Sequence, residues 1–190
     1  MALREEARTP HAAQKRYLRY LQRSLSCLTD SRWIVGPPPA PTASEEERAL
    51  TISEAQLRLK RQDNAPLLFT ASQRFELVPD EKHEGEWKAS THGYVYRVSL
   101  ETTDGDAEII GWHWHPTPTP RRPQPHVHVR SEQPYLGVTF SRLHIPSGRV
   151  AFEEVVRFLI AELQVLPNRR DWVEVLTDSE DRFRAYRTWA

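Results

Sequence analysis

Cysteine is nearly absent from this chain of 190 residues, and its scarcity excludes several kinds of site. The single thiol, Cys27, has no partner for an internal disulfide, which fits a reducing compartment. A zinc site built on paired thiolates is also excluded. Any bound metal would therefore need histidine and carboxylate ligands.

Net charge and long apolar runs are lacking as well. The 26 Lys and Arg residues balance the 26 Asp and Glu residues, and the pI is about 7.1, so overall charge favours neither a nucleic acid nor a membrane surface. No apolar stretch is long enough to span a membrane, and no signal peptide opens the chain. A glycine-rich phosphate loop and internal repeats are also missing. These absences predict a cytoplasmic protein without a membrane partner.

Helical patterns are predicted in the first third of the chain. Thr9 and Pro10 form a helix start, and apolar residues at helical spacing continue it to about residue 28. Ser44 and Glu47 form a capping box that predicts a second helix, reaching about Gln62. We expect residues 1–35 to hold the basic amphipathic helix, 36–43 to be a proline-rich connector, and 44–190 to form the main domain of one compact unit.

From residue 65 the apolar residues alternate, which is typical of strands. Asp104 and Gly105 mark a hairpin turn. The later apolar stripe that starts at Phe152 predicts a helix covering the sheet, and Asp171 and Asp178 are expected to cap two short terminal helices. The predicted strands lie at 66–70, 74–78, 87–90, 93–100, 107–116, 125–129 and 136–145. The predicted class is α+β: two N-terminal helices, a central antiparallel sheet and a C-terminal helix packed on it.

Two His-x-His pairs stand out from this pattern. The segments Gly111-Trp-His-Trp-His-Pro116 and Pro125-His-Val-His-Val-Arg130 flank a proline-rich run. Residues two apart on a strand point to the same face, so each pair should lie on one face with Trp or Val on the other. If the two strands pair in register, four imidazoles can converge, with His144 nearby. We call His113, His115, His126 and His128 the histidine cluster.

One interpretation of the cluster is proton transfer. An imidazole titrates near neutral pH, so one ring can act as base and another as acid in metal-independent cleavage of RNA, which requires no cofactor. A guanidinium group would then hold the phosphate, and Arg121, Arg122 and Arg130 are the candidates closest in sequence.

A second interpretation is metal binding. His-x-His on a strand presents two nitrogen ligands on one side, which suits a transition metal. The spacing from His126 through His128 to Glu132, followed by Pro146 and Gly148, partly resembles the cupin motifs. The metal ligands would then be His113, His115, His126, His128 and Glu132.

Basic residues crowd the predicted first helix: Lys15, Arg16, Arg19 and Arg23. Such a stripe is either a solvated face or a surface for nucleic acid or an acidic partner. In the latter case Arg16 and Arg19 would contact the partner.

The region from about residue 75 to 165 resembles the TumE-like family of bacterial toxin–antitoxin systems. The resemblance rests on the order of five segments: Tyr94-Val-Tyr-Arg-Val, Asp104-Gly, Ile109-Ile-Gly-Trp-His-Trp-His-Pro, Pro125-His-Val-His and Phe152-Glu-Glu-Val-Val. His126 and His128 match the family pattern directly, and His115 is a shifted equivalent. The resemblance implies a toxin-like activity on nucleic acid and a cognate antitoxin as partner.

These observations lead to a ranked expectation. The first hypothesis is a toxin-like ribonuclease with His113, His115, His126 and His128 as catalytic residues and RNA as substrate. The alternatives are a cupin-like metal-binding protein and a non-catalytic antitoxin, immunity protein or assembly subunit.

Overall fold

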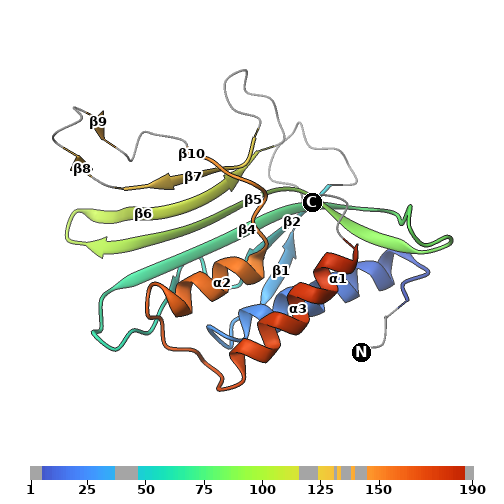
Figure 1. Cartoon of the computed structure of the whole chain (residues 1–190), viewed down its shortest axis with the longest axis horizontal. Helices are drawn as coiled ribbons and strands as arrows, with labels where there is room; N and C mark the ends of the chain where they lie inside the picture. The colour runs from blue at the N-terminus through green and yellow to red at the C-terminus, as the bar shows by residue number, and fades with distance from the viewer. Residues whose placement is uncertain are drawn as a thin grey trace.

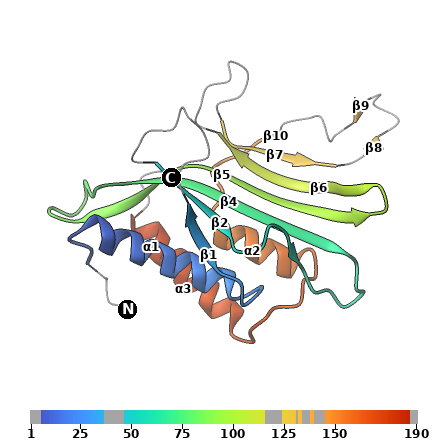
Figure 2. The same ribbon diagram turned by 180° about the vertical axis from the view of Figure 1, so that it is seen from behind.

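The part of the chain that the structure describes folds into one large antiparallel sheet with three helices on one of its faces (Figures 1 and 2). The structure is a computed structural model and describes residues 6–36, 47–115, 124–130, 132–133, 138–139 and 145–186. The eight strands of the main sheet follow the order β1-β2-β4-β5-β6-β7-β10, with β3 also paired to β4. The class is therefore α+β, as predicted.

The strand bounds show how the sheet is built from successive hairpins. The long central strands β4 and β5 each join two strands that the sequence predicted separately, and β5 and β6 meet at the Asp104–Gly105 turn. The short strands β8 and β9 form a separate two-stranded ribbon. The strands are β1 (Trp33–Gly36), β2 (Arg48–Ile52), β3 (Leu57–Arg58), β4 (Leu67–Pro79), β5 (Trp87–Thr102), β6 (Gly105–Trp114), β7 (His126–Val129), β8 (Glu132–Gln133), β9 (Val138–Thr139) and β10 (Ile145–Pro146).

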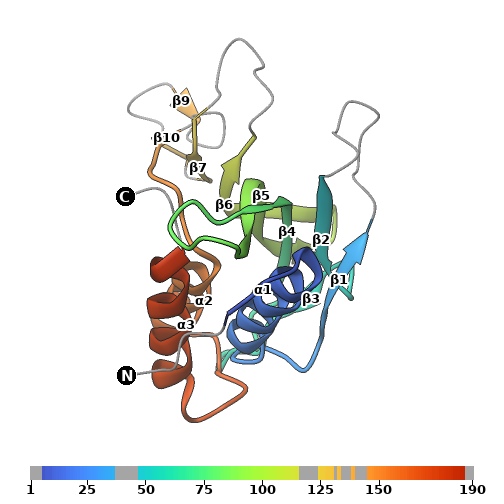
Figure 3. The ribbon, with the colours of Figure 1, turned by 90° about the vertical axis from the view of Figure 1, so that its right-hand side faces the viewer.

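The three helices are α1 (Pro10–Leu25), α2 (Phe152–Ala161) and α3 (Trp172–Tyr186). Helix α1 starts as predicted, because the Thr9 hydroxyl accepts a hydrogen bond from the Ala12 N–H. Figure 3 shows all three helices on the same side of the sheet. No helix in the described part of the chain has the length and hydropathy needed to cross a membrane.

The core lies between these helices and the sheet. Phe152 of α2 is 2% exposed, and its ring packs edge-on against Trp33 at 5.0 Å and in a tilted arrangement against Tyr96 at 5.7 Å. Trp112 meets Phe158 edge-on at 5.2 Å. Truncating a buried aromatic side chain of this kind typically costs about 3–5 kcal/mol. This apolar layer determines which face of each strand is buried, and so places the alternate residues on the opposite face.

The predicted second helix, from Ser44 to about Gln62, is wrong. Residues 48–52 form strand β2 between β1 and β4, and residues 57–58 form β3. Leu50 and Ile52 alternate with exposed Thr51, so only one face of an extended segment is apolar. Pairing with two neighbouring strands satisfies the backbone and overrides the local helical signal. The connector 36–43 lies outside the described residues, apart from Gly36 in β1.

The prediction of two short terminal helices is also wrong. Residues 172–186 form the single helix α3, in which Asp178 is an interior residue and not a cap. Its carboxylate pairs with Arg182 one turn later at 3.0 Å and with Arg23 of α1 at 2.8 Å. Asp178 therefore connects α1 and α3.

The basic face of α1 is not uniformly solvated. Arg16 is only 4% exposed, donates to the Trp87 carbonyl at 2.8 Å and lies 3.6 Å from the Glu86 carboxylate. Lys15 and Arg19 are exposed. Arg16 therefore attaches α1 to the β4–β5 hairpin and is not placed to meet a partner in solution, whereas Arg19 is on the surface.

A histidine cluster on the open face of the sheet

Strands β6 and β7 bring the histidines together on the face opposite the helices. His113 pairs directly with His126, and Gly111 pairs with His128. Because directly paired residues share a face, the three rings lie side by side, while Trp112 and Trp114 enter the core behind them. We call the helix-free side of the sheet the open face.

The rings are close enough to act as one group. The centroids of His113 and His128 are 4.4 Å apart in a stacked arrangement, and those of His126 and His128 are 5.1 Å apart. One ring nitrogen from each of these three histidines lies within 4.8 Å of the other two. His115 is exposed at the end of β6, and its ring is 5.7 Å from His113 and 6.2 Å from His126. The cluster is therefore a triad with a fourth histidine at its rim.

The backbone and a carboxylate orient two of the rings. Nδ1 of His126 lies 2.9 Å from the Gln124 carbonyl oxygen, which accepts a hydrogen bond when Nδ1 carries the proton. Nδ1 of His128 lies 3.6 Å from Oε1 of Glu108, and Oε2 of Glu108 pairs with Arg97 Nε at 2.5 Å. When Nδ1 of a ring carries the proton, the lone pair that can coordinate a metal is the one on Nε2. Such outer contacts are typical of histidines that bind metals.

Glu108 was missed by the sequence reasoning because of a β-bulge. Simple alternation along β6 places Glu108 with Ile110 and Trp112, on the core face. The register between β5 and β6 shifts at this point, so that Val98 pairs with Ile110 whereas Ser99 pairs with Glu108. The extra residue, Ile109, turns Glu108 to the open face. Nothing in the local sequence marks this bulge.

Gly111 provides the space that the cluster needs. A Cβ at this position would lie 2.8 Å from Nε2 of His113 and 3.1 Å from Oε1 of Glu108. Any larger residue would therefore push against both side chains. Glycine at this position lets His113, Glu108 and His128 share one small area of the sheet.

His113 is buried and neutral. It is 8% exposed, and its Nε2 has no hydrogen-bond partner among the described residues. Burial, reinforced by the neighbouring imidazole of His128, lowers the pKa of His113 to about 3. The pKa of His115 is also lowered, because its side chain is partly desolvated at the rim of the cluster and lies near His126. The His113 ring is therefore neutral at neutral pH, with one N–H and one nitrogen lone pair.

The other predicted site residues are placed as follows. Arg130 is exposed directly after β7, and its backbone N–H donates to the Ile109 carbonyl at 2.8 Å. Glu132 belongs to β8 of the separate ribbon. Arg121, Arg122 and His144 lie outside the described residues.

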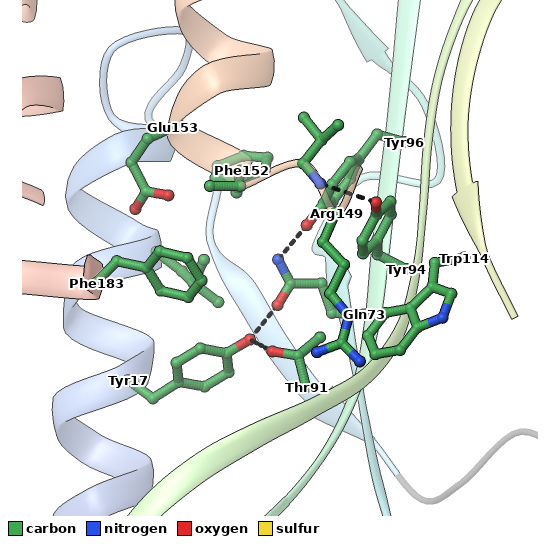
Figure 4. Close-up of a pocket in the computed structure, with 13 residues that line it drawn as sticks. Tyr17, Gln73, Thr91, Tyr94, Tyr96, Trp114, Arg149, Phe152, Glu153 and Phe183 are labelled. Atoms are coloured by element: carbon green, nitrogen blue, oxygen red, sulfur yellow. Dashed lines mark hydrogen bonds between the residues drawn. The ribbon is translucent and has the colours of Figure 1, made fainter. Parts of the chain in front are cut away.

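A second polar group lies on the helix-covered face (Figure 4). Tyr17 of α1 donates to Oε1 of Gln73, and Nε2 of Gln73 donates to the Tyr96 hydroxyl at 2.6 Å. The Tyr17 hydroxyl also lies 3.1 Å from Oγ1 of Thr91. Burial raises the pKa of both tyrosines, so both hydroxyls stay protonated. The adjoining cavity has only about 30 Å³, the space of a single water, so this group is structural.

Fold and site together define an α+β protein with a buried histidine triad on the open face of its sheet. Comparison of the chain with family models, with curated proteins and with solved structures finds no match.

Proposed function

We propose that this protein binds a first-row transition metal ion through His113, His126 and His128. The observation that carries the proposal is the convergence of three ring nitrogens within 4.8 Å of one another, from paired positions on two adjacent strands. Tetrahedral ligands 2.0–2.1 Å from zinc are about 3.4 Å apart, so metal binding would draw the rings together by up to about 1.4 Å.

The donor set indicates which ions fit. Imidazole nitrogen suits zinc, nickel, copper, cobalt and iron, and not the hard ions magnesium and calcium. Three protein ligands also leave at least one coordination position for water or another ligand, as in catalytic and not in structural zinc sites. Glu108 would act from the outer shell by accepting from the His128 ring.

Metal binding fits these contacts better than metal-independent RNA cleavage does. An acid–base pair needs one protonated ring and access to a phosphate. His113 and His126 are 8% and 6% exposed, and the low pKa of His113 keeps that ring from taking up the second proton that a general acid would give. The ribonuclease hypothesis, with its RNA substrate and cognate antitoxin, stays a prediction.

Metal analysis of the purified, untagged chain tests the proposal. After incubation with Co(II) or Zn(II) and removal of excess ion, we expect about one ion per chain. His113→Ala and His126→Ala should each weaken the affinity at least 100-fold. His92→Ala is the matched control, because His92 is also a strand histidine but pairs with Glu76 at 3.3 Å, apart from the cluster.

Circular dichroism of each variant separates loss of metal from loss of fold. Metal content that stays the same in the triad variants and in His92→Ala overturns the proposal. Cleavage of RNA by metal-free protein, lost in His126→Ala/His128→Ala, would instead restore the ribonuclease hypothesis.

A further inference from the structure

A hollow of about 490 Å³ adjoins the histidine cluster. Its lining includes Thr51, Ser72 and Val95 from three neighbouring strands, and His115 belongs to both the hollow and the cluster. A volume of this size is within the range of small-molecule sites, about 300–1,000 Å³. The hollow therefore has room for an organic ligand and not only for water.

The strand register connects the hollow to the triad. Thr51 pairs with Ser72, Ser72 with Val95, Val95 with His113, and His113 with His126. Directly paired residues share a face, so these five residues form one row across the open face. Small side chains occupy the row up to His113. A ligand lying over Thr51, Ser72 and Val95 would therefore reach the triad at the end of the row.

The charges near both ends of this row favour an anionic ligand. Three neutral imidazoles bring no negative charge, so a bound divalent ion would keep its full charge. The nearest carboxylate described there, Glu108, is already paired with Arg97. At the other end Arg74 lines the hollow, two residues further along β4 than Ser72 of the row.

Arg74 is held in place by one acid and has further donors. Its Nε lies 3.6 Å from Oε1 of Glu47, a carboxylate that is almost fully buried. A guanidinium group has five N–H donors and binds a carboxylate through two of them at once. Arg74 can therefore pair with Glu47 and a ligand together.

We propose that the hollow binds a small organic dianion, with one acidic group on the triad's metal ion and the other on Arg74. Arg74 on β4 and His113 on β6 are two strand spacings apart and two residues out of register, which together give roughly 12 Å. This distance favours an extended dicarboxylate over a compact one. The inference rests on the proposed metal site.

Calorimetric and visible-absorption titrations of the Co(II)-loaded full chain test this proposal. Adipate, hexanoate and adipamide serve as probes, because they have the same chain length and carry two, one and no charges. We expect adipate to bind at least tenfold more tightly than hexanoate and adipamide to leave the Co(II) spectrum unchanged. Arg74→Gln should reduce the affinity for adipate to that for hexanoate.

Two further variants test whether ligand binding needs the volume of the hollow and whether it needs the charge of Arg74 in particular. Ser72→Phe should fill the hollow and abolish binding of both acids, with the Co(II) content retained. Arg58→Gln is the matched control, because Arg58 pairs with Glu101 at 2.7 Å away from the hollow, and adipate should bind it as it binds the wild type.

The outcomes distinguish the two proposals. A chain that takes up no Co(II) overturns both the metal site and the dianion. A chain that takes up Co(II) but binds adipate and hexanoate equally, or keeps the preference in Arg74→Gln, overturns the dianion alone.

Discussion

The two faces of the sheet differ in how fully their buried polar groups are hydrogen-bonded. On the helix-covered face, the Tyr17, Gln73 and Tyr96 side chains bond to one another around a cavity that holds about one water. On the open face, three imidazoles crowd together, and Nε2 of His113 finds no hydrogen-bond partner among the described residues. Leaving a buried polar atom unpaired costs about 1–3 kcal/mol, a cost that a bound ligand would remove. The first group is suited to holding the fold and the second to receiving a ligand.

The largest expected effect is on the covered face. Gln73→Leu removes the amide between Tyr17 and Tyr96 and leaves two buried hydroxyls each short of a partner. We expect the free energy of unfolding to fall by about 4 kcal/mol, roughly 3 kcal/mol for the Tyr96 hydroxyl and roughly 1 kcal/mol for the Tyr17 hydroxyl, which keeps Thr91 as a partner. Urea denaturation measures this. Metal uptake by the folded fraction should be unchanged, and a loss of metal binding there would contradict the separation of the two faces.

A residue on the covered face should also make the stability of the protein depend on pH. Glu153 is 2% exposed, and burial raises its pKa to about 7, although the Ser24 hydroxyl lies 3.0 Å from Oε1. The folded state therefore holds this proton more tightly than the unfolded state. The resulting stabilisation is fully present below about pH 4.5, and it is lost as the pH rises through 7.

Glu153→Gln replaces the ionising group with a neutral one of the same shape. At pH 8 we expect the variant to be more stable than the wild type, by on the order of 3 kcal/mol, with a much smaller difference at pH 5. Thermal unfolding at the two pH values measures the difference. A variant less stable than the wild type at pH 8 would show that Glu153 is held ionised.

The smallest of these effects concerns the outer shell of the open face. Glu108→Gln removes the carboxylate beside His128 while keeping its size, and metal affinity should fall about tenfold. Glu101→Gln is the matched control, since Glu101 is a strand carboxylate paired with Arg58 instead. Competition with a chelator measures both affinities. Equal affinities in the two variants would remove Glu108 from the site.

Local patterns predicted the open face well. The alternation of Trp112 and Trp114 with His113, and of His126 and His128 with Val127, predicts which side chains face the core and which share the other face. The start of α1 at Thr9 and the helix that begins at Phe152 likewise follow from residues close together in the chain.

Long-range pairing explains what could not be predicted. The bulge at Ile109 depends on the match between β5 and β6, and it alone brings Glu108 to His128. Residues 48–52 become a strand because β1 and β4 lie on either side of them. Arg16 is buried because the β4–β5 hairpin reaches α1. The hollow is formed by residues from β2, β4, β5 and the end of β6, so no single segment of sequence could reveal it.

X-ray absorption spectroscopy of the Zn(II)-loaded chain tests the central claim most directly, because it reports the ligands of the ion itself. We predict a first shell of nitrogen at 2.0–2.1 Å, with the outer scattering of three imidazoles. A first shell of oxygen without imidazole scattering would contradict a metal site on the histidine triad. A sulfur ligand about 2.3 Å from the zinc, supplied by Cys27, would contradict it as well.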